Sequence, residues 1–94
     1  MIVDFRCKET EKIWGEEHSK KLPHQIQKRV LDKLSQIHDA ETLNDLKVPS
    51  GNKLEPLQGN RLGQHSIRIN RQWRICFEWR DGDAYNVEIE DYHH

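Results

Sequence analysis

The sequence has few cysteines and no long apolar segment. Cys7 and Cys76 stand far apart and form no Cys-x-x-Cys pair, so they are too few for a disulfide framework and favour two reduced, packed thiols. No stretch approaches the roughly 18 to 20 consecutive apolar residues that cross a bilayer. The opening MIVDFRCKET also lacks the basic-then-apolar layout of a signal peptide. We therefore expect a cytoplasmic protein with no membrane partner.

Apolar residues are scarce throughout the 94 residues, of which 34% are hydrophobic and 33% are charged. A chain of this length predicts one domain, residues 1–94. Its core must be thin, so it is expected to cover only one face of any sheet and to leave the other face in water.

The net charge of −1 hides an uneven distribution of charge. Residues 53–74 carry five cations and one acid, whereas residues 75–94 carry six acids and one cation. A local stripe of cations attracts phosphate even on a nearly neutral molecule. Because few counterions would be released, we expect only weak binding to free nucleic acid.

Residues 22–40 have the clearest helical pattern. Pro23 stands where a first helical turn tolerates proline, and apolar side chains then recur at spacings of four, four and three, at Ile26, Val30, Leu34 and Ile37. A shorter helix is predicted within residues 9–17. A further helical turn is predicted in 41–48, where Thr42 and Asp45 have the spacing of a capping box.

Four segments have the composition or alternation of strands: 2–7, 64–70, 73–79 and 84–90. Short polar turns join the last three into an antiparallel meander. Alternation places one set of side chains on the covered face, namely Ile67, Ile69, Trp73, Ile75, Phe77, Trp79, Tyr85, Val87 and Ile89. The elements together predict an α+β fold of two layers, with helices on one face of an antiparallel sheet.

The uncovered face is predicted to display Arg68 and Arg74 on neighbouring strands. Glu88 and Glu90 share that face by parity. Two interpretations stay open: the arginines form exposed cross-strand ion pairs with these glutamates, or they bind phosphate.

Two segments, KLEPLQGNRLGQHSIRINRQWRICFEW and DAYNVEIEDYH, resemble the HigB toxins, the plasmid-maintenance killer proteins of the RelE and ParE superfamily. The elements of the resemblance are Leu-Glu-Pro-Leu before Gly-Asn-Arg, the SIRIN-x-QWR-I-x-F hairpin and the final Asp-Tyr-His. The resemblance implies a RelE-like toxin fold, in which two helices pack on a small curved antiparallel sheet.

The same resemblance implies an endoribonuclease that cuts messenger RNA in the ribosomal A site. It also implies a HigA-type helix-turn-helix antitoxin, through which the toxin–antitoxin complex would bind operator DNA. ParE relatives act on DNA gyrase instead, so a non-enzymatic gyrase inhibitor is the alternative, and a pure interaction module is a third possibility. The terminal Asp-Tyr-His favours RNA.

Metal-independent cleavage of RNA needs a base for the 2′-hydroxyl, a cation for the phosphoryl oxygens and an acid for the departing 5′-oxygen. Arg74 suits the second task because its guanidinium is permanently charged and presents a fork of donors; a structural ion pair with Glu78 or Glu90 is the alternative. His93 can transfer a proton near neutral pH, and Tyr92 offers a ring on which a base can stack.

Two carboxylates are further catalytic candidates. Asp91 either orients His93 or accepts the 2′-hydroxyl proton, unless it only caps a turn. Glu55 and Gln58 stand in the loop where some HigB toxins carry histidine and lysine. Glu55 is then a second candidate base, or else a structural acid bonded to Arg61 or Lys53.

The expected RNA contacts are Lys53, Gln58, Arg61 and Arg68. The remaining histidines lack partners at metal-ligand spacing, so no metal and no other cofactor is expected. His65, Trp14, Trp73 and Trp79 are predicted to be packing residues.

Overall fold

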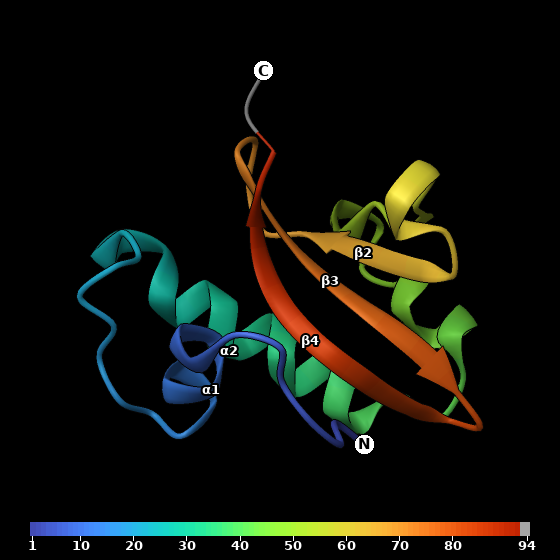
Figure 1. Cartoon of the computed structure of the whole chain (residues 1–94), viewed down its shortest axis with the longest axis horizontal. Helices are drawn as coiled ribbons and strands as arrows, with labels where there is room; N and C mark the ends of the chain where they lie inside the picture. Colours follow the sequence, from blue (N-terminus) through green and yellow to red (C-terminus); the bar gives the residue numbers. More distant parts are fainter. Residues whose placement is uncertain (93–94) are drawn as a thin grey trace.

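The computed structural model describes residues 1–92, in which two α-helices precede a four-stranded antiparallel sheet (Figure 1). The helices are α1 (Lys8–Trp14) and α2 (His24–Asp39), and the strands are β1 (Glu55–Pro56), β2 (Gln64–Arg68), β3 (Trp73–Arg80) and β4 (Asp83–Asp91). The strand order is β1-β2-β3-β4, and β3 and β4 bend visibly as they cross the molecule. The α+β prediction is confirmed. In this part of the chain no helix is long and apolar enough to cross a membrane.

Helix α2 packs its apolar stripe on one face of the sheet. All four predicted stripe residues are buried, at Ile26, Val30, Leu34 and Ile37. They join a core with sheet residues that are fully buried, namely Ile67, Ile75, Phe77 and Val87. Each such side chain contributes roughly 1.5 to 3 kcal/mol through burial. This packing covers one face of the sheet. On the opposite face Ser66, Arg74 and Cys76 are also buried, so the expectation that this face lies in water was wrong at these positions.

Helix α1 lies against the outer edge of β4. It buries Thr10 and Ile13, and the Thr10 hydroxyl accepts a hydrogen bond from the backbone N–H of Ile89 at 3.1 Å. An unpaired N–H on this strand edge is thereby satisfied by a side chain. Helix α1 therefore helps to hold the last part of β4.

The amino-terminal segment is extended but does not form the regular strand predicted for residues 2–7. It makes two isolated parallel bridges, Ile2 with Ala84 and Phe5 with Val87. Between them the Asp4 carboxylate accepts the backbone N–H of Asn86 at 2.6 Å. The ladder is interrupted because β4 itself is irregular at this point.

A β-bulge in β4 changes the face on which Tyr85 lies. On its two sides, Cys76 pairs with Glu88 and Glu78 pairs with Tyr85. Two residues of β4 therefore oppose one residue of β3, and Asn86 adopts the left-handed conformation with φ 54°. The prediction that Tyr85 faces the core was wrong, because alternation cannot reveal the inserted residue. Ala84 is buried in its place.

Three short 3₁₀-helices connect α2 to β2: η1 (Leu43–Lys47), η2 (Ser50–Asn52) and η3 (Gly59–Arg61). The predicted capping box is present at the start of η1. The Asp45 carboxylate accepts the backbone N–H groups of Thr42 and Glu41, at 3.1 and 3.0 Å, and these bonds lower the pKa of Asp45. Strand β1 was not predicted, because two residues are too few to show alternation.

Candidate active site

A cleft of about 460 Å³ opens where the loop before β1 meets the turn between β2 and β3 and the end of β4. Its lining residues are Lys53, Glu55, Arg68, Asn70, Arg71, Arg74 and Tyr92. Four of them are cations and one is an acid, so the cationic stripe seen in the sequence gathers at one place. A concave cationic surface of this kind attracts phosphate.

Arg74 is held in this cleft by neutral acceptors and one carboxylate. Its side chain is largely buried, with the residue 9% exposed. Nε donates to Ser66 Oγ at 2.7 Å, Nη2 donates to the Lys53 carbonyl at 2.7 Å, and Glu55 Oε1 lies 3.7 Å from Nη2. Within residues 1–92 these contacts use Nε and Nη2, so Nη1 is the nitrogen left for a ligand.

The expected structural partners of Arg74 are engaged elsewhere. Glu90 pairs with Arg61, and Glu78 accepts a hydrogen bond from Asn86 at 2.7 Å. The alternative in which Arg74 forms an ion pair with Glu78 or Glu90 is therefore wrong.

Tyr92 forms another wall of the cleft. The Arg74 guanidinium lies 5.9 Å from the centroid of its ring, and its backbone N–H donates to the Gln72 carbonyl at 2.5 Å. Burial raises the pKa of Tyr92, so its hydroxyl stays protonated near neutral pH. The next residue, His93, lies outside the described residues.

Asp91 lies on the other face of the sheet from Arg74, because it stands directly opposite Trp73 in the β3–β4 register. Its Oδ2 accepts a hydrogen bond from Gln72 Nε2 at 3.1 Å. Gln72 thus contacts both Asp91 and Tyr92 from the β2–β3 turn. This role of Gln72 could not be predicted, since a turn residue can face any neighbouring element.

Glu55 and Arg68 both line the cleft. Glu55 stands at the sheet edge with its side chain 52% exposed. Its ion pair is with Arg74, so the alternative in which Glu55 is bonded to Arg61 or Lys53 is wrong. Arg68 stands directly opposite Arg74, and its Nε donates to the Asn70 carbonyl at 3.0 Å. Gln58 is exposed and is not part of the lining.

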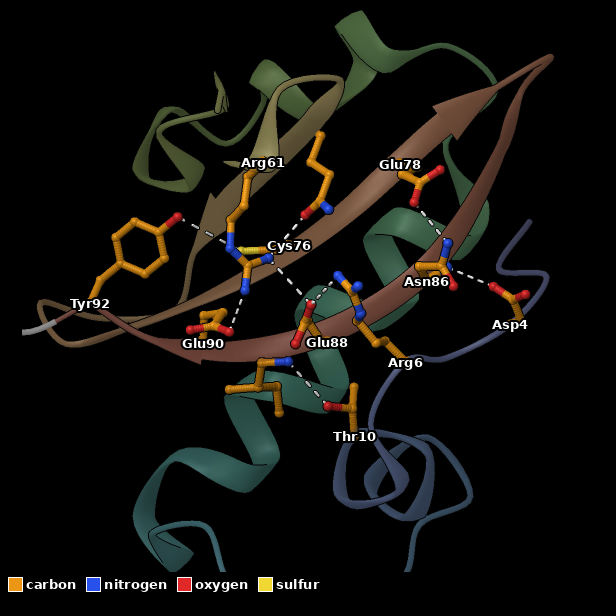
Figure 2. A network of polar contacts seen from close by, with 12 residues as sticks. Asp4, Arg6, Thr10, Arg61, Cys76, Glu78, Asn86, Glu88, Glu90 and Tyr92 are labelled. Atoms are coloured by element: carbon orange, nitrogen blue, oxygen red, sulfur yellow. Dashed lines mark hydrogen bonds and ion pairs between the residues drawn. The ribbon is translucent and has the colours of Figure 1, made fainter. Parts of the chain in front are cut away.

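Arg61, a predicted RNA contact, lies outside the cleft lining and is engaged by two carboxylates of β4 (Figure 2). Its Nη1 donates to Glu88 Oε2 at 3.2 Å, and its Nη2 forms an ion pair with Glu90. Arg6 approaches Glu88 from the other side, at 3.4 Å. We call the contacts of Arg61 with Glu88 and Glu90 the β4 clamp.

Cys76 lies at the β4 clamp and is fully buried. Its Sγ is 4.0 Å from the Tyr92 hydroxyl. Figure 2 marks this contact beside Arg61. Burial raises the pKa of the Cys76 thiol to about 11. The thiol is therefore neutral near pH 7 and is no nucleophile there.

A family model described as the RelE-like toxin of the type II toxin-antitoxin system HigB matches residues 3–93. The chain belongs to this family. The HigB-like toxin is 36% identical over 93 residues to Endoribonuclease HigB of Proteus vulgaris, with 99% of this chain and 100% of the relative covered. It is 35% identical over 91 residues to Toxin HigB-1 of Vibrio cholerae, with 96% of each chain covered. The predicted resemblance is confirmed, and membership of a toxin–antitoxin family implies an antitoxin partner.

Solved structures share the fold of the HigB-like toxin. YafQ from E. coli superposes with a TM-score of 0.66 at 14% identity, covering 98% of this chain and 92% of that one. YoeB in the YoeB-YefM complex from Staphylococcus aureus gives 0.58 at 22% identity, covering 100% and 97%. At these identities the likeness concerns the fold alone.

The other predicted residues of the HigB-like toxin have packing roles. His65 lies 6.2 Å from Phe77, ring to ring, and burial lowers the pKa of His65. Trp14, Trp73 and Trp79 pack against the core.

Both cysteines of the toxin are free thiols. Among residues 1–92, no group of three or more His, Cys, Asp or Glu side chains is placed to hold a metal ion.

Proposed function

We propose that this HigB-like toxin is an endoribonuclease that cuts messenger RNA in the ribosomal A site and so inhibits translation in the cytoplasm. One observation carries the proposal: a buried, tethered arginine, Arg74, shares a cationic cleft with a carboxylate and an aromatic ring, Glu55 and Tyr92. The name of the Proteus vulgaris relative, Endoribonuclease HigB, supports the same activity.

The proposed reaction is attack of the ribose 2′-oxygen on the adjacent phosphorus, without a metal. The new bond joins the 2′-oxygen to phosphorus and the bond from phosphorus to the 5′-oxygen breaks, which leaves a 2′,3′-cyclic phosphate and a 5′-hydroxyl. Glu55 accepts the proton from the 2′-hydroxyl, and His93 donates a proton to the departing 5′-oxygen. Arg74 Nη1 donates to a phosphoryl oxygen as negative charge grows there.

The remaining cleft residues bind and orient the RNA in this proposal. Tyr92 stacks on a base, which is worth roughly 1 to 3 kcal/mol. Lys53, Arg68 and Arg71 contact phosphates next to the cleaved linkage. Asp91 acts through Gln72, which holds the backbone of Tyr92 in place.

The proposal assigns the binding and positioning of the messenger mainly to the ribosome, because the cleft alone binds RNA weakly. The net charge is −1, and only four cations line the cleft, so few counterions are released and free RNA binds weakly. A messenger held in the A site reaches the cleft at a high effective concentration and in one geometry.

Cleavage by the purified toxin tests the proposal. Ribosomes programmed with a defined messenger are mixed with excess toxin, and the 5′ ends of the fragments are mapped. Arg74→Ala should lower the single-turnover rate by about 10²- to 10³-fold, since one preorganised donor of this kind is worth that much. Arg80→Ala, an exposed arginine on the same sheet face, is the control and should cleave like the wild type. Intact transcripts together with DNA damage in cells that produce the toxin would contradict the proposal. That result would favour the alternative, a non-enzymatic inhibitor of DNA gyrase.

We also propose that the antitoxin partner is a HigA-type helix-turn-helix protein and that the complex binds operator DNA through it. A neighbouring gene for such a protein should restore growth when both are expressed. Growth arrest that persists with the antitoxin present would contradict this assignment.

A further inference from the structure

Asn52, a residue outside the cleft lining, is buried at the end of η2 and makes hydrogen bonds with both ends of its amide. Its Nδ2 donates to Gln36 Oε1 at 3.0 Å and to the Leu46 carbonyl at 3.2 Å. Its Oδ1 accepts from Lys33 Nζ at 2.5 Å. The three-residue η2 is therefore tied to α2 and η1 through one side chain.

The next residue, Lys53, has an uncommon backbone conformation. Its φ of 48° and ψ of 49° lie in the left-handed region, which a residue with a Cβ occupies only where its surroundings impose it. This conformation turns the Lys53 carbonyl towards Arg74 Nη2, at 2.7 Å. It also leaves the Lys53 side chain in the lining of the cleft.

The Lys53 carbonyl is one of the acceptors that hold the guanidinium of Arg74. Ser66 supplies the others, with its Oγ on Nε at 2.7 Å and its carbonyl on Nη2 at 3.4 Å. Bonds to different nitrogens set the plane of a guanidinium group, and so they fix the position of Nη1. Glu55 is a looser neighbour at 3.7 Å.

We infer that Asn52 is a positioning residue for RNA cleavage, because it locks the turn whose Lys53 carbonyl aims Arg74. The inference rests on the proposed function for its effect on cleavage, but the hold of Asn52 on Arg74 is a property of the toxin alone. Burial lowers the pKa of Lys33, which is consistent with a dry environment around this amide.

A double-mutant cycle tests the link between Asn52 and Arg74. Asn52→Ala should lower the single-turnover cleavage rate by about 10- to 100-fold, since small displacements of a catalytic group have effects of this size. The ribosome concentration that gives half-maximal rate should stay within about threefold, because Asn52 lines no part of the cleft. In the Arg74→Ala background, Asn52→Ala should cause no further loss. An equal loss in both backgrounds would overturn the inference, since it would mean general destabilisation.

Gln27→Ala is the matched control. Gln27 also ties a loop through its amide, accepting from Ser19 N at 3.1 Å and donating to the carbonyls of Ser19 and Leu22 at 2.8 and 2.9 Å. It stands near the beginning of α2 and does not line the cleft. Its substitution should cost stability without the drop in cleavage rate. A drop equal to that of Asn52→Ala would count against a specific role.

A second measurement needs no cleavage at all. Hydrogen exchange of the Arg74 Nε–H, followed by NMR, should be at least about tenfold faster in Asn52→Ala than in the wild type or Gln27→Ala, because its buried bond to Ser66 loosens. Unchanged exchange would overturn the inference. A wild type that cuts no messenger, with exchange still accelerated in the variant, would refute the proposed function and leave the hold on Arg74 intact.

A pair of variants at Lys53 covers the case in which Asn52→Ala fails to fold. Lys53→Gly and Lys53→Val both lack the ammonium group, but glycine adopts a φ of 48° freely and valine resists it. Lys53→Val should cleave at least about tenfold more slowly than Lys53→Gly and show faster Arg74 exchange. Equal values for the two variants would contradict the inference.

Discussion

Arg68 and Arg74 lie directly opposite each other on neighbouring antiparallel strands. Like charges at such positions repel, and the repulsion destabilises the sheet. Arg74 is offset by Glu55, whereas within residues 1–92 the Arg68 side chain contacts the Asn70 carbonyl and no carboxylate. The toxin therefore carries an unfavourable pair of cations at its cleft, which a bound phosphate would relieve.

Removing the charge of Arg68 should make the toxin more stable and less active. Arg68→Gln is expected to raise the free energy of unfolding by about 0.2 to 1 kcal/mol, measured by urea denaturation. The same variant should bind programmed ribosomes more weakly. Arg71→Gln is the stability control, because Arg71 has no arginine opposite it in the strand register. A lower stability for Arg68→Gln than for Arg71→Gln would contradict the argument.

The β4 clamp should contribute more stability than the exposed ion pairs. Arg61→Ala leaves Glu90 without its cation and leaves Glu88 with Arg6 alone, and these side chains are only 32% and 13% exposed. We expect a loss of about 1 to 2 kcal/mol, below the value for fully buried pairs because the groups retain some water. Lys12→Ala, which removes a pair with Glu9 in which the lysine side chain is 47% exposed, should cost less than Arg61→Ala in the same urea experiment. Equal losses would mean that the clamp is as weak as a surface pair.

Cys76 should resist alkylation in the folded toxin. The thiolate is the reactive form, and with a pKa of about 11 the thiol stays protonated until the pH approaches that value. Iodoacetamide at pH 8 should therefore modify Cys7, which is partly exposed, and leave Cys76 unmodified, as read by mass spectrometry of peptides. Urea should make both react. Rapid modification of Cys76 in the wild type would contradict the burial described above.

The bulge residue Asn86 should tolerate glycine better than alanine. Its φ of 54° favours residues without a Cβ, and its side chain donates to Glu78 at 2.7 Å. Both substitutions lose that bond, but only alanine keeps the backbone strain. Asn86→Ala should therefore unfold about 1 kcal/mol more easily than Asn86→Gly. Thermal or urea denaturation measures the difference, and equal stability would argue against strain at this position.

Most of the fold could be predicted because periodicity reports burial directly. Helix α2 begins immediately after Pro23, and its apolar stripe is the buried face. The hairpins from β2 to β4 follow from alternation. The bulge at Asn86 could not be foreseen, since an extra residue leaves the composition of a strand unchanged and only the pairing register reveals it. The isolated bridges of the amino-terminal segment could not be foreseen either, because they follow from the same bulge in β4.

Part of the candidate site could be predicted from strand parity and from the resemblance to the HigB toxins. Lys53, Glu55, Arg68, Arg74 and Tyr92 line one cleft as a group. Arg61 and Asp91 lie outside the cleft lining. The partner of a charged side chain depends on which groups the fold brings near it, and the sequence does not show this. Arg61 projects from η3 towards two carboxylates of β4, and the parity of Asp91 turns it to the opposite face. The role of Asn52 could not be predicted from the sequence, since it depends on contacts with α2 and η1.

The bridges from Ile2 to Ala84 and from Phe5 to Val87 have a consequence for biosynthesis. Residues 2–5 are synthesised before residues 84–87, so this edge of the sheet cannot close until β4 has left the ribosome. Strand β4 also carries Tyr92 to the cleft. The cleft is therefore completed late in synthesis, after both helices have emerged.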